Sequence, residues 1–204
     1  MDRITPDGPE NATATMAEQR GPLAPELAVS QWFNTQKPLT LAALRGRPVF
    51  LHSFQLLCPG CVSDAIPQLK RIERVFGHTD LQIIGIHTVF EHHAAMMPVT
   101  LKAFLHEYRI TTPIAVDTAD ETSGIPITMR RFGMRGTPSS VLIGRDGTIL
   151  HHTFGVEDDL ALGARLAMAL SASIAEHIGN RNDVNDSTCA DGRCEVPEAK
   201  GAAW

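Results

Sequence analysis

The sequence predicts an α/β fold in which a central mixed sheet carries helices on both faces. Three observations predict it. Between about residues 49 and 132, short apolar runs alternate with amphipathic helical patterns, the order expected when strands and helices form packed layers. The strand-like runs 139–143 and 148–154 flank Arg145-Asp146-Gly147, whose Asp-Gly pair indicates a β-hairpin. A long amphipathic helix is predicted over about 158–178, after the hairpin.

The first elements surround a pair of cysteines. Residues 49–54 are a short, mostly apolar run after Pro48, which predicts a buried strand. A helix is predicted after Cys58-Pro59-Gly60-Cys61, because apolar residues then recur at three- and four-residue spacing. These apolar residues are Val62, Ile66, Leu69, Ile72 and Phe76. Pro67 should kink this helix and Gly77 should end it.

The second half supplies the rest of the sheet. Residues 81–90 form a near-continuous apolar run, which is typical of a central parallel strand covered on both faces. A helix around 101–108 and a strand at 114–116 follow, and then a helix at 125–132. The residues of the last helix that should face inward are Leu160, Leu166, Ala167, Leu170 and Ile174.

Composition limits the class of protein. The chain has 204 residues, 18 Lys and Arg against 23 Asp and Glu, and a net charge of −5. Its mean hydropathy is −0.05, and no apolar run approaches the ~18–20 residues that a membrane span needs. Because no basic stripe is present, neither nucleic acid nor a membrane is expected as a partner. The first residues lack the pattern of a secretory signal, so a cytoplasmic location is expected.

The chain divides into three parts. Residues 1–21 are poor in large apolar groups and are expected to be a disordered leader. Residues 24–178 form the folded domain. Residues 179–204 are a polar, flexible tail that carries a second cysteine pair, Cys189 and Cys194.

The first cysteine pair lies where a strand turns into a helix. Unpaired N–H groups and the positive end of the helix dipole favour an anion there, so a thiolate at Cys58 is expected to be stabilised. The two-residue spacer holds Cys61 close enough to form a disulfide with Cys58. We therefore expect Cys58 to attack a disulfide and Cys61, further inside, to resolve the mixed disulfide. A strand-CxxC-helix arrangement in a βαβ context is typical of thiol redox chemistry.

These residues resemble a known family. The stretch 54–61 looks like the active site of the thioredoxin fold, and Gly136-Thr137-Pro138 before a strand resembles its cis-proline motif. The N-terminal segments 24–27 and 39–46, and the helix-strand insertion between Phe90 and Asp117, resemble the redoxin branch. That branch holds the TlpA/ResA-type thiol-disulfide oxidoreductases and the AhpC/TSA peroxiredoxins. The resemblance implies that Thr137 and Pro138 face the substrate and that no metal or organic cofactor is required.

Two positions depart from the family's pattern. Leu57 stands where the residue before the first cysteine is usually Trp, and His52 stands where a buried acid is common. His52 is interpreted in two ways, as a core histidine or as a proton relay to Cys61, since a neutral imidazole can accept a proton.

The residues that precede Cys58 distinguish between two redox activities. A peroxiredoxin needs Pro seven residues and Thr or Ser three residues before its cysteine, whereas Leu51 and Gln55 stand there. We therefore expect dithiol-disulfide exchange on disulfide-containing proteins or small thiols, with a thioredoxin or glutathione system as the external reductant. A peroxidase and a non-catalytic, redox-switched binding module are the alternatives.

The second pair lies in Cys189-Ala190-Asp191-Gly192-Arg193-Cys194, where the Asp-Gly turn makes a local disulfide feasible. A second redox pair, a metal-binding tail and an inert tail all remain open.

Overall fold

The computed structural model describes residues 21–178, 189–190 and 193–194. Within residues 21–178 the strands form a six-stranded sheet in the order β1-β4-β3-β2-β5-β6. The strands are β1 (Val29–Phe33), β2 (Val49–Phe54), β3 (Gln82–His87), β4 (Ile114–Asp117), β5 (Ser139–Ile143) and β6 (Ile149–Phe154). Strands β2, β3 and β4 run parallel, and β1, β5 and β6 pair antiparallel with their neighbours. The predicted mixed sheet is confirmed.

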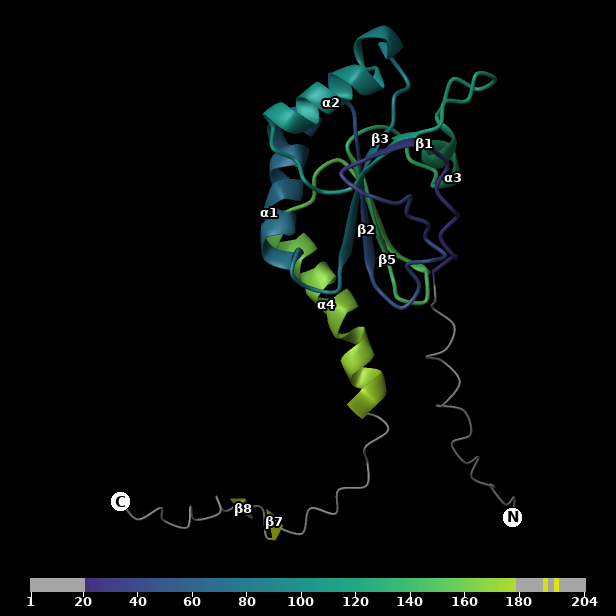
Figure 1. Cartoon of the computed structure of the whole chain (residues 1–204). Helices are drawn as coiled ribbons and strands as arrows, with labels where there is room; N and C mark the ends of the chain where they lie inside the picture. The colour runs from purple at the N-terminus through teal and green to yellow at the C-terminus, as the bar shows by residue number, and fades with distance from the viewer. Residues whose placement is uncertain (1–20, 179–188, 191–192, 195–204) are drawn as a thin grey trace, which may run out of the picture. The chain divides into compact units, whose positions relative to one another are not determined.

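Helices cover both faces of the sheet. They are α1 (Ile66–Phe76), α2 (Pro98–Glu107), α3 (Ile127–Arg131) and α4 (Asp159–Ile178). In Figure 1, α1, α2 and α4 lie on one side of the sheet and α3 on the other. Phe50 of β2 packs with Leu69 of α1 and Leu166 of α4 in one core cluster, whereas Leu51 packs with Met129 of α3 in another. The prediction of helices on both faces is therefore also confirmed.

The helix after the cysteine pair begins with a widened turn. Residues Cys61–Ala65 form a π-helical turn, and the regular α1 starts at Ile66. Pro67 has no N–H to donate, and its ring crowds the carbonyl group one turn earlier, which accounts for the widening. Gly77 closes the helix by donating its N–H to the carbonyl of Glu73 at 2.8 Å. Pro67 was expected to kink the helix from within, whereas the structure places it in the first turn of α1, directly after the π-helical turn.

Three expectations about elements were wrong or incomplete. Strand β1 was not predicted at all. The helix expected at 125–132 covers only Ile127–Arg131. In α4, Leu160 is 83% exposed and Ala167 is also exposed, because the buried stripe runs through Leu162, Leu166 and Ala169.

A glycine in β3 allows close packing beneath the cysteines. A Cβ atom on Gly85 would lie 2.3 Å from Cδ1 of Ile114 and 3.4 Å from Cε1 of Phe54. No side chain fits between these two residues without displacing one of them. Ile114 and Phe54 belong to the same core cluster as Cys61.

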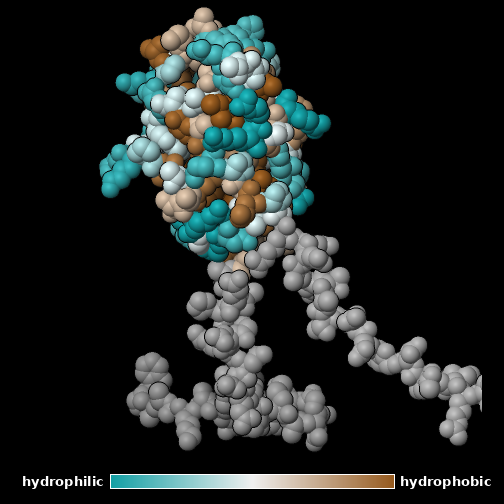
Figure 2. Space-filling view, turned by 90° about the vertical axis from the view of Figure 1, so that its right-hand side faces the viewer, coloured by the Kyte–Doolittle hydropathy of each residue, from teal (hydrophilic) through white to brown (hydrophobic). Residues whose placement is uncertain are grey.

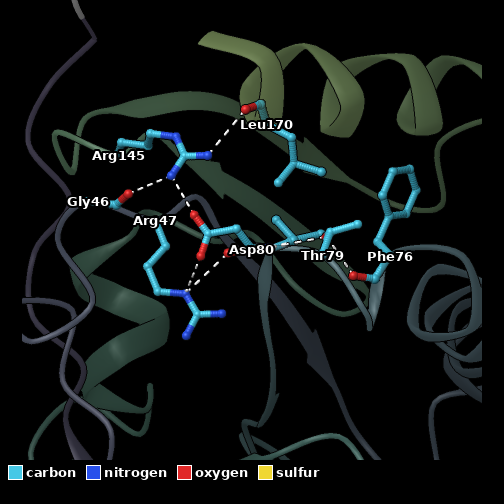
Figure 3. A network of polar contacts seen from close by, with 8 residues as sticks. Gly46, Arg47, Phe76, Thr79, Asp80, Arg145 and Leu170 are labelled. Atoms are coloured by element: carbon cyan, nitrogen blue, oxygen red, sulfur yellow. Dashed lines mark hydrogen bonds and ion pairs between the residues drawn. The ribbon is translucent and has the colours of Figure 1, made fainter. Parts of the chain in front are cut away.

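A polar network joins four segments at the end of the sheet where β2 begins (Figure 3). Arg145, in the β5–β6 turn, donates to the carbonyl of Gly46 at 2.6 Å, to Oδ2 of Asp80 at 2.5 Å and to the carbonyl of Leu170 at 3.2 Å. Arg47 donates to the carbonyl of Asp80 at 3.1 Å and lies 3.3 Å from its Oδ1. One carboxylate thus holds two guanidinium groups from segments far apart in the sequence.

The chain divides into two units after Leu170. In the second unit the structure describes the end of α4 and one antiparallel pair, β7 (Cys189–Ala190) and β8 (Arg193–Cys194). The predicted leader and most of the predicted tail lie outside the described residues. No helix in the described part of the chain is long and apolar enough to cross a membrane. On the face shown in Figure 2, apolar residues lie in separate places among hydrophilic ones.

Candidate functional site

The two cysteines lie at the start of the helical segment that follows β2. The carbonyl oxygen of Cys58 accepts the N–H groups of Cys61 at 3.0 Å and Val62 at 3.1 Å, so the first helical turn closes on Cys58. Cys58 is half-buried and Cys61 is fully buried, and both are unpaired thiols. The more accessible sulfur therefore belongs to the residue that the sequence predicts as the attacking one.

The sulfur of Cys58 lies between the backbone N–H of Cys61 and the segment Gly136-Thr137-Pro138, called the proline loop below. The N–H of Cys61 donates to Sγ of Cys58 at 3.3 Å, and the Cys58 thiol donates to the carbonyl of Thr137 at 3.4 Å. The Thr137–Pro138 peptide bond is cis, as the resemblance implied. The structure thus brings Cys58, Cys61, Thr137 and Pro138 together.

Burial governs the chemistry of Cys61. Removal from water raises the pKa of the Cys61 thiol to about 12, and its hydrogen bond with Cys58 adds to the increase. Hydrogen bonds from the backbone of Gln55 and the side chain of Thr137 act in the opposite direction. Cys61 is therefore a neutral thiol at pH 7, and its conversion to a nucleophile depends on the groups around it.

His52, interpreted from the sequence as either a core histidine or a proton relay, lies on β2. Its side chain is 2% exposed, and neither ring nitrogen has a hydrogen-bond partner among the described residues. Burial lowers the pKa of His52 to about 4, so the ring is neutral at pH 7. Within the described part of the chain no hydrogen bond joins His52 to Cys61.

A second buried histidine was not singled out from the sequence. His87 ends β3 and is 1% exposed, and its ring centroid lies 5.5 Å from that of Phe54. Burial lowers the pKa of His87 to about 4, and the described residues offer neither ring nitrogen a partner. Its only signal in the sequence is a polar residue at the end of an apolar run.

Gln55 is a further site residue whose role was missed. Its side chain is 1% exposed, and its carboxamide contacts both the proline loop and the loop after β3. Nε2 lies 3.3 Å from Oγ1 of Thr137 and 3.4 Å from Oε1 of Glu91, and Oε1 accepts the N–H of Phe90 at 3.2 Å. The sequence showed only that the hydroxyl of a peroxiredoxin is missing at this position.

Exposed apolar groups occur next to the cysteines and the proline loop. Leu57 precedes Cys58 and is 54% exposed, and Phe154, at the end of β6, is 49% exposed. A Cβ atom on Gly136 would lie 2.9 Å from the Phe154 ring, so this ring borders the proline loop. The guanidinium of Arg135 lies 5.0 Å from the ring centroid, a cation–π arrangement.

The second cysteine pair has a defined backbone register. Cys189 and Cys194 are direct partners in the antiparallel pair β7–β8, next to the partners Ala190 and Arg193. Among the residues that the structure describes, no group of three or more His, Cys, Asp or Glu side chains is arranged to hold a metal ion.

Comparisons with known proteins agree with this geometry. Residues 21–152 match the AhpC/TSA family. A crystal structure of a thioredoxin-like superfamily protein is 48% identical, with a TM-score of 0.70, and the match covers 72% of this chain and 96% of that one. A thiol-disulfide isomerase from Corynebacterium glutamicum is 44% identical, with a TM-score of 0.69, and covers 74% and 97% of the two chains. The predicted thioredoxin-like fold is thereby confirmed.

A curated relative is much longer than this chain. Protein DipZ of Mycobacterium bovis is 30% identical over 138 residues, which are 66% of this chain. This chain spans 19% of that protein's length.

Proposed function

The chain belongs to the AhpC/TSA family, and on that basis we propose that it is a thiol-disulfide oxidoreductase acting through Cys58 and Cys61. The observation that carries the proposal is the placement of the Cys58 sulfur. It is half-buried, it accepts the N–H of Cys61, and it faces the carbonyl of Thr137 beside Pro138. The solved relative from Corynebacterium glutamicum, described as a thiol-disulfide isomerase, supports the same reaction class.

The proposed reaction has two exchange steps. The Cys58 thiolate attacks a substrate disulfide, so that a bond forms between Cys58 and one substrate sulfur while the other leaves as a thiolate. Cys61 then loses its proton and attacks the sulfur of Cys58, which releases the second substrate thiolate and leaves a Cys58–Cys61 disulfide. An external dithiol or glutathione returns this disulfide to two thiols.

The substrates, the reductant and the location are further parts of the proposal. Disulfide-containing proteins or small disulfides are the proposed substrates, and Thr137 and Pro138 are proposed to contact them. The exposed Leu57 and Phe154 offer apolar surface beside the reactive sulfur. A thioredoxin or glutathione system is the proposed reductant. The cytoplasm is the proposed location, and fractionation of the source cells tests that location.

We also propose His52 as the proton acceptor for Cys61. Its neutral ring keeps a lone pair available at pH 7, because burial lowers its pKa to about 4. A ring with so low a pKa is a weak base and holds a proton only briefly, so His52 would give the proton to the leaving substrate thiolate within the same turnover.

The stoichiometry of disulfide exchange and the reduction potential of the Cys58–Cys61 couple test the proposed function. The reduced full-length chain is mixed with a protein disulfide substrate, and the thiols gained by the substrate are compared with the mass lost by the chain. One Cys58–Cys61 disulfide should form for each substrate disulfide reduced, and equilibration with glutathione buffers gives the potential of the couple. The proposal would be contradicted if the parent chain reduced no disulfide, or if the Cys58→Ser variant reduced the substrate as well as the parent chain does.

Peroxide reduction is the second candidate, because the family name covers peroxidases. The buried carboxamide of Gln55 stands in place of the hydroxyl that would contact a peroxide, and its polar atoms already have partners. We therefore expect hydroperoxide consumption to be much slower than disulfide reduction. The reverse order would favour the peroxidase, and slow turnover of both substrates would favour a redox-switched binding module.

Cys189 and Cys194 are proposed as a second redox pair. Opposed residues of an antiparallel pair have Cα atoms about 4.5–5.5 Å apart, within the range that a disulfide bridges. Counting alkylated thiols after peptide digestion, in graded thiol buffers, tests whether this pair titrates as a two-electron couple.

A further inference from the structure

An exposed cation lies directly before the proline loop. The guanidinium carbon of Arg135 is 5.0 Å from the ring centroid of Phe154, and this ring is itself 49% exposed. Among the residues that the structure describes, no carboxylate forms an ion pair with Arg135. Contact with the ring restrains the long side chain, so less conformational entropy is lost when its N–H groups bind an anion.

The backbone fixes the ring of Phe154 relative to the proline loop. Phe154 is the direct partner of Ser139 in the antiparallel pair β5–β6. The N–H of Gly155 donates to the carbonyl of Pro138 at 2.8 Å, so the end of β6 is joined to the loop itself. The ring that contacts Arg135 is therefore held beside the loop whose carbonyl group contacts the reactive sulfur.

A charge of opposite sign lies on the other side of Cys58. Glu91 follows β3, and its Oε1 lies 3.4 Å from Nε2 of Gln55, directly after β2. Arg135 contacts the end of β6 instead. In the sheet order β3-β2-β5-β6, the ends of β2, β3 and β6 and the start of β5 meet at one edge. Because Cys58 follows β2 and contacts Thr137 just before β5, its sulfur lies between the two charges.

We propose that Arg135 is a specificity-determining residue that binds a carboxylate next to the disulfide of a peptide or protein substrate, on the β6 side of Cys58. The inference rests on the proposed function and names the substrate class of the same site. The exposed side chains of Leu57 and Phe154 extend the contact surface beyond the two sulfur atoms, which favours a polypeptide over a small thiol such as glutathione. Glu91 repels a second acid, so the carboxylate is accepted on one side of the substrate cysteine only.

A set of six peptides measures this preference. Each peptide has one cysteine, coupled as a mixed disulfide to an aromatic thiol that absorbs visible light once it is released. Asp, Asn or Lys stands either directly before or directly after the cysteine. In the attack, the Cys58 thiolate bonds to the peptide sulfur, and the bond to the aromatic sulfur breaks with its electron pair, because the more acidic thiol leaves faster.

The conditions isolate the effect of the charge. The full-length chain carries Cys189→Ser and Cys194→Ser, so that only the first pair reacts. At pH 7.5 the ring of His152 adds no charge, because partial burial and repulsion from His151 and Arg135 lower its pKa. Each rate is divided by the rate of the same peptide with dithiothreitol, which removes differences in intrinsic reactivity. A change in the ionisation of Cys58 affects all peptides alike and cancels in the ratio of the Asp rate to the Asn rate.

The parent chain should prefer one acidic peptide. One of the two Asp peptides should react about three-fold faster than its Asn counterpart, the size of effect that one exposed ion pair produces. The corresponding Lys peptide should react more slowly than the Asn peptide. Arg135→Gln should remove these differences, whereas Arg135→Lys should keep part of them. Arg74→Gln removes an equal charge from an exposed position on α1 and should leave the ratio unchanged.

Several outcomes would overturn the inference. They are an Asp peptide no faster than its Asn counterpart, a preference that survives Arg135→Gln, and equal acceleration of both Asp peptides, which would indicate general attraction. The preference should also weaken in high salt, and a preference that salt leaves unchanged would contradict an exposed ion pair.

The mixed disulfide of glutathione with the same aromatic thiol distinguishes the two sources of a carboxylate. It should lose less rate on Arg135→Gln than the preferred Asp peptide does, and an equal loss would overturn the assignment to a polypeptide. A parent chain that releases no aromatic thiol from any of these disulfides would instead contradict the proposed function.

Discussion

The thiol of Cys58 donates a hydrogen bond to the carbonyl oxygen of Thr137 at 3.4 Å, which joins two segments 79 residues apart at the reactive sulfur. The contact leaves Cys58 half-buried, with one side occupied by the proline loop. Cys61 lies behind it, fully buried. This difference in exposure predicts different consequences when either cysteine is replaced.

Cys58→Ser should abolish disulfide exchange, and Cys61→Ser should accumulate a mixed disulfide between Cys58 and the substrate. The reason is that only Cys58 is accessible for attack, whereas Cys61 is placed to resolve the product. Intact-mass spectrometry after mixing with a small disulfide measures both outcomes, with Cys189→Ser and Cys194→Ser in every sample. Full turnover by Cys61→Ser would show that the assigned roles are wrong.

His52 and His87 provide a matched pair for the proposed proton transfer. Both are buried imidazoles on neighbouring strands, and burial lowers the pKa of each to about 4. If His52 accepts the proton of Cys61, His52→Phe should slow the release of the second substrate thiol several-fold, while His87→Phe should not. Equal effects of the two substitutions on that rate would indicate packing rather than proton transfer.

The same histidines predict a loss of stability in acid. Their pKa is about 4 in the folded chain and about 6.5 in the unfolded chain, so the unfolded chain binds more protons between these values. Their contribution is therefore fully present above about pH 6.5 and is lost as the pH falls to about 4, at on the order of 3 kcal/mol for each histidine. Burial raises the pKa of Asp117, which acts in the opposite sense just above its ordinary value and offsets part of this loss.

Urea denaturation at pH 7 and pH 4.5 measures this dependence. The double variant His52→Phe with His87→Phe should flatten the difference in the free energy of unfolding between the two pH values. His78→Gln, at an exposed position, is the control and should keep it. A parent chain equally stable at both pH values would contradict the assignment of neutral, buried rings.

Asp80→Asn should destabilise the chain by about 1 kcal/mol without changing the rates of disulfide exchange. Asp80 binds Arg47 and Arg145, but its side chain is 51% exposed, which limits the value of each ion pair. A double-mutant cycle with Arg145→Gln, followed by urea denaturation, measures the coupling. Additive effects of the two substitutions would show that the network in Figure 3 contributes no pairwise stability.

Truncation after Ile178 should leave the melting temperature nearly unchanged. The six-stranded sheet is complete within residues 21–178, and residues 179–204 carry few large apolar groups with which to offset an ordering cost of ~1–2 kcal/mol per residue. Any loss of activity on truncation should be reproduced by Cys189→Ser with Cys194→Ser. A large drop in melting temperature, or a loss of activity that the double substitution does not reproduce, would contradict this prediction.

The sequence predicts the parts of the fold that local patterns determine. The apolar runs and the Asp-Gly turn are sufficient for β2 to β6 and for the long helices. They do not reveal β1, because β4, its partner in the described sheet, lies some 80 residues further along and two of the five positions of β1 are exposed. Leu160 was wrongly expected to face inward, because α4 has apolar residues on more than one face and only the packing of Leu162 and Leu166 selects the buried one.

In the candidate site, too, the local motifs could be predicted from the sequence and the long-range contacts could not. The cysteine pair and Thr137-Pro138 are visible as motifs, and the structure places them together. The role of Gln55 is not visible, because it depends on the directions of side chains from the proline loop and from the loop after β3. Likewise, nothing local to His87 shows that its ring is buried without a partner among the described residues.

Gly85 limits how the sequence beneath the cysteines can diverge. A methyl group there would need the space that Ile114 and Phe54 now fill, and Phe54 shares a core cluster with Cys61. Overpacking of this kind costs roughly 1–3 kcal/mol, so a lone alanine should be selected against. The three positions should instead vary as a compensating set of roughly constant total volume. A library that randomises all three should recover alanine at 85 only together with a smaller residue at 54 or 114.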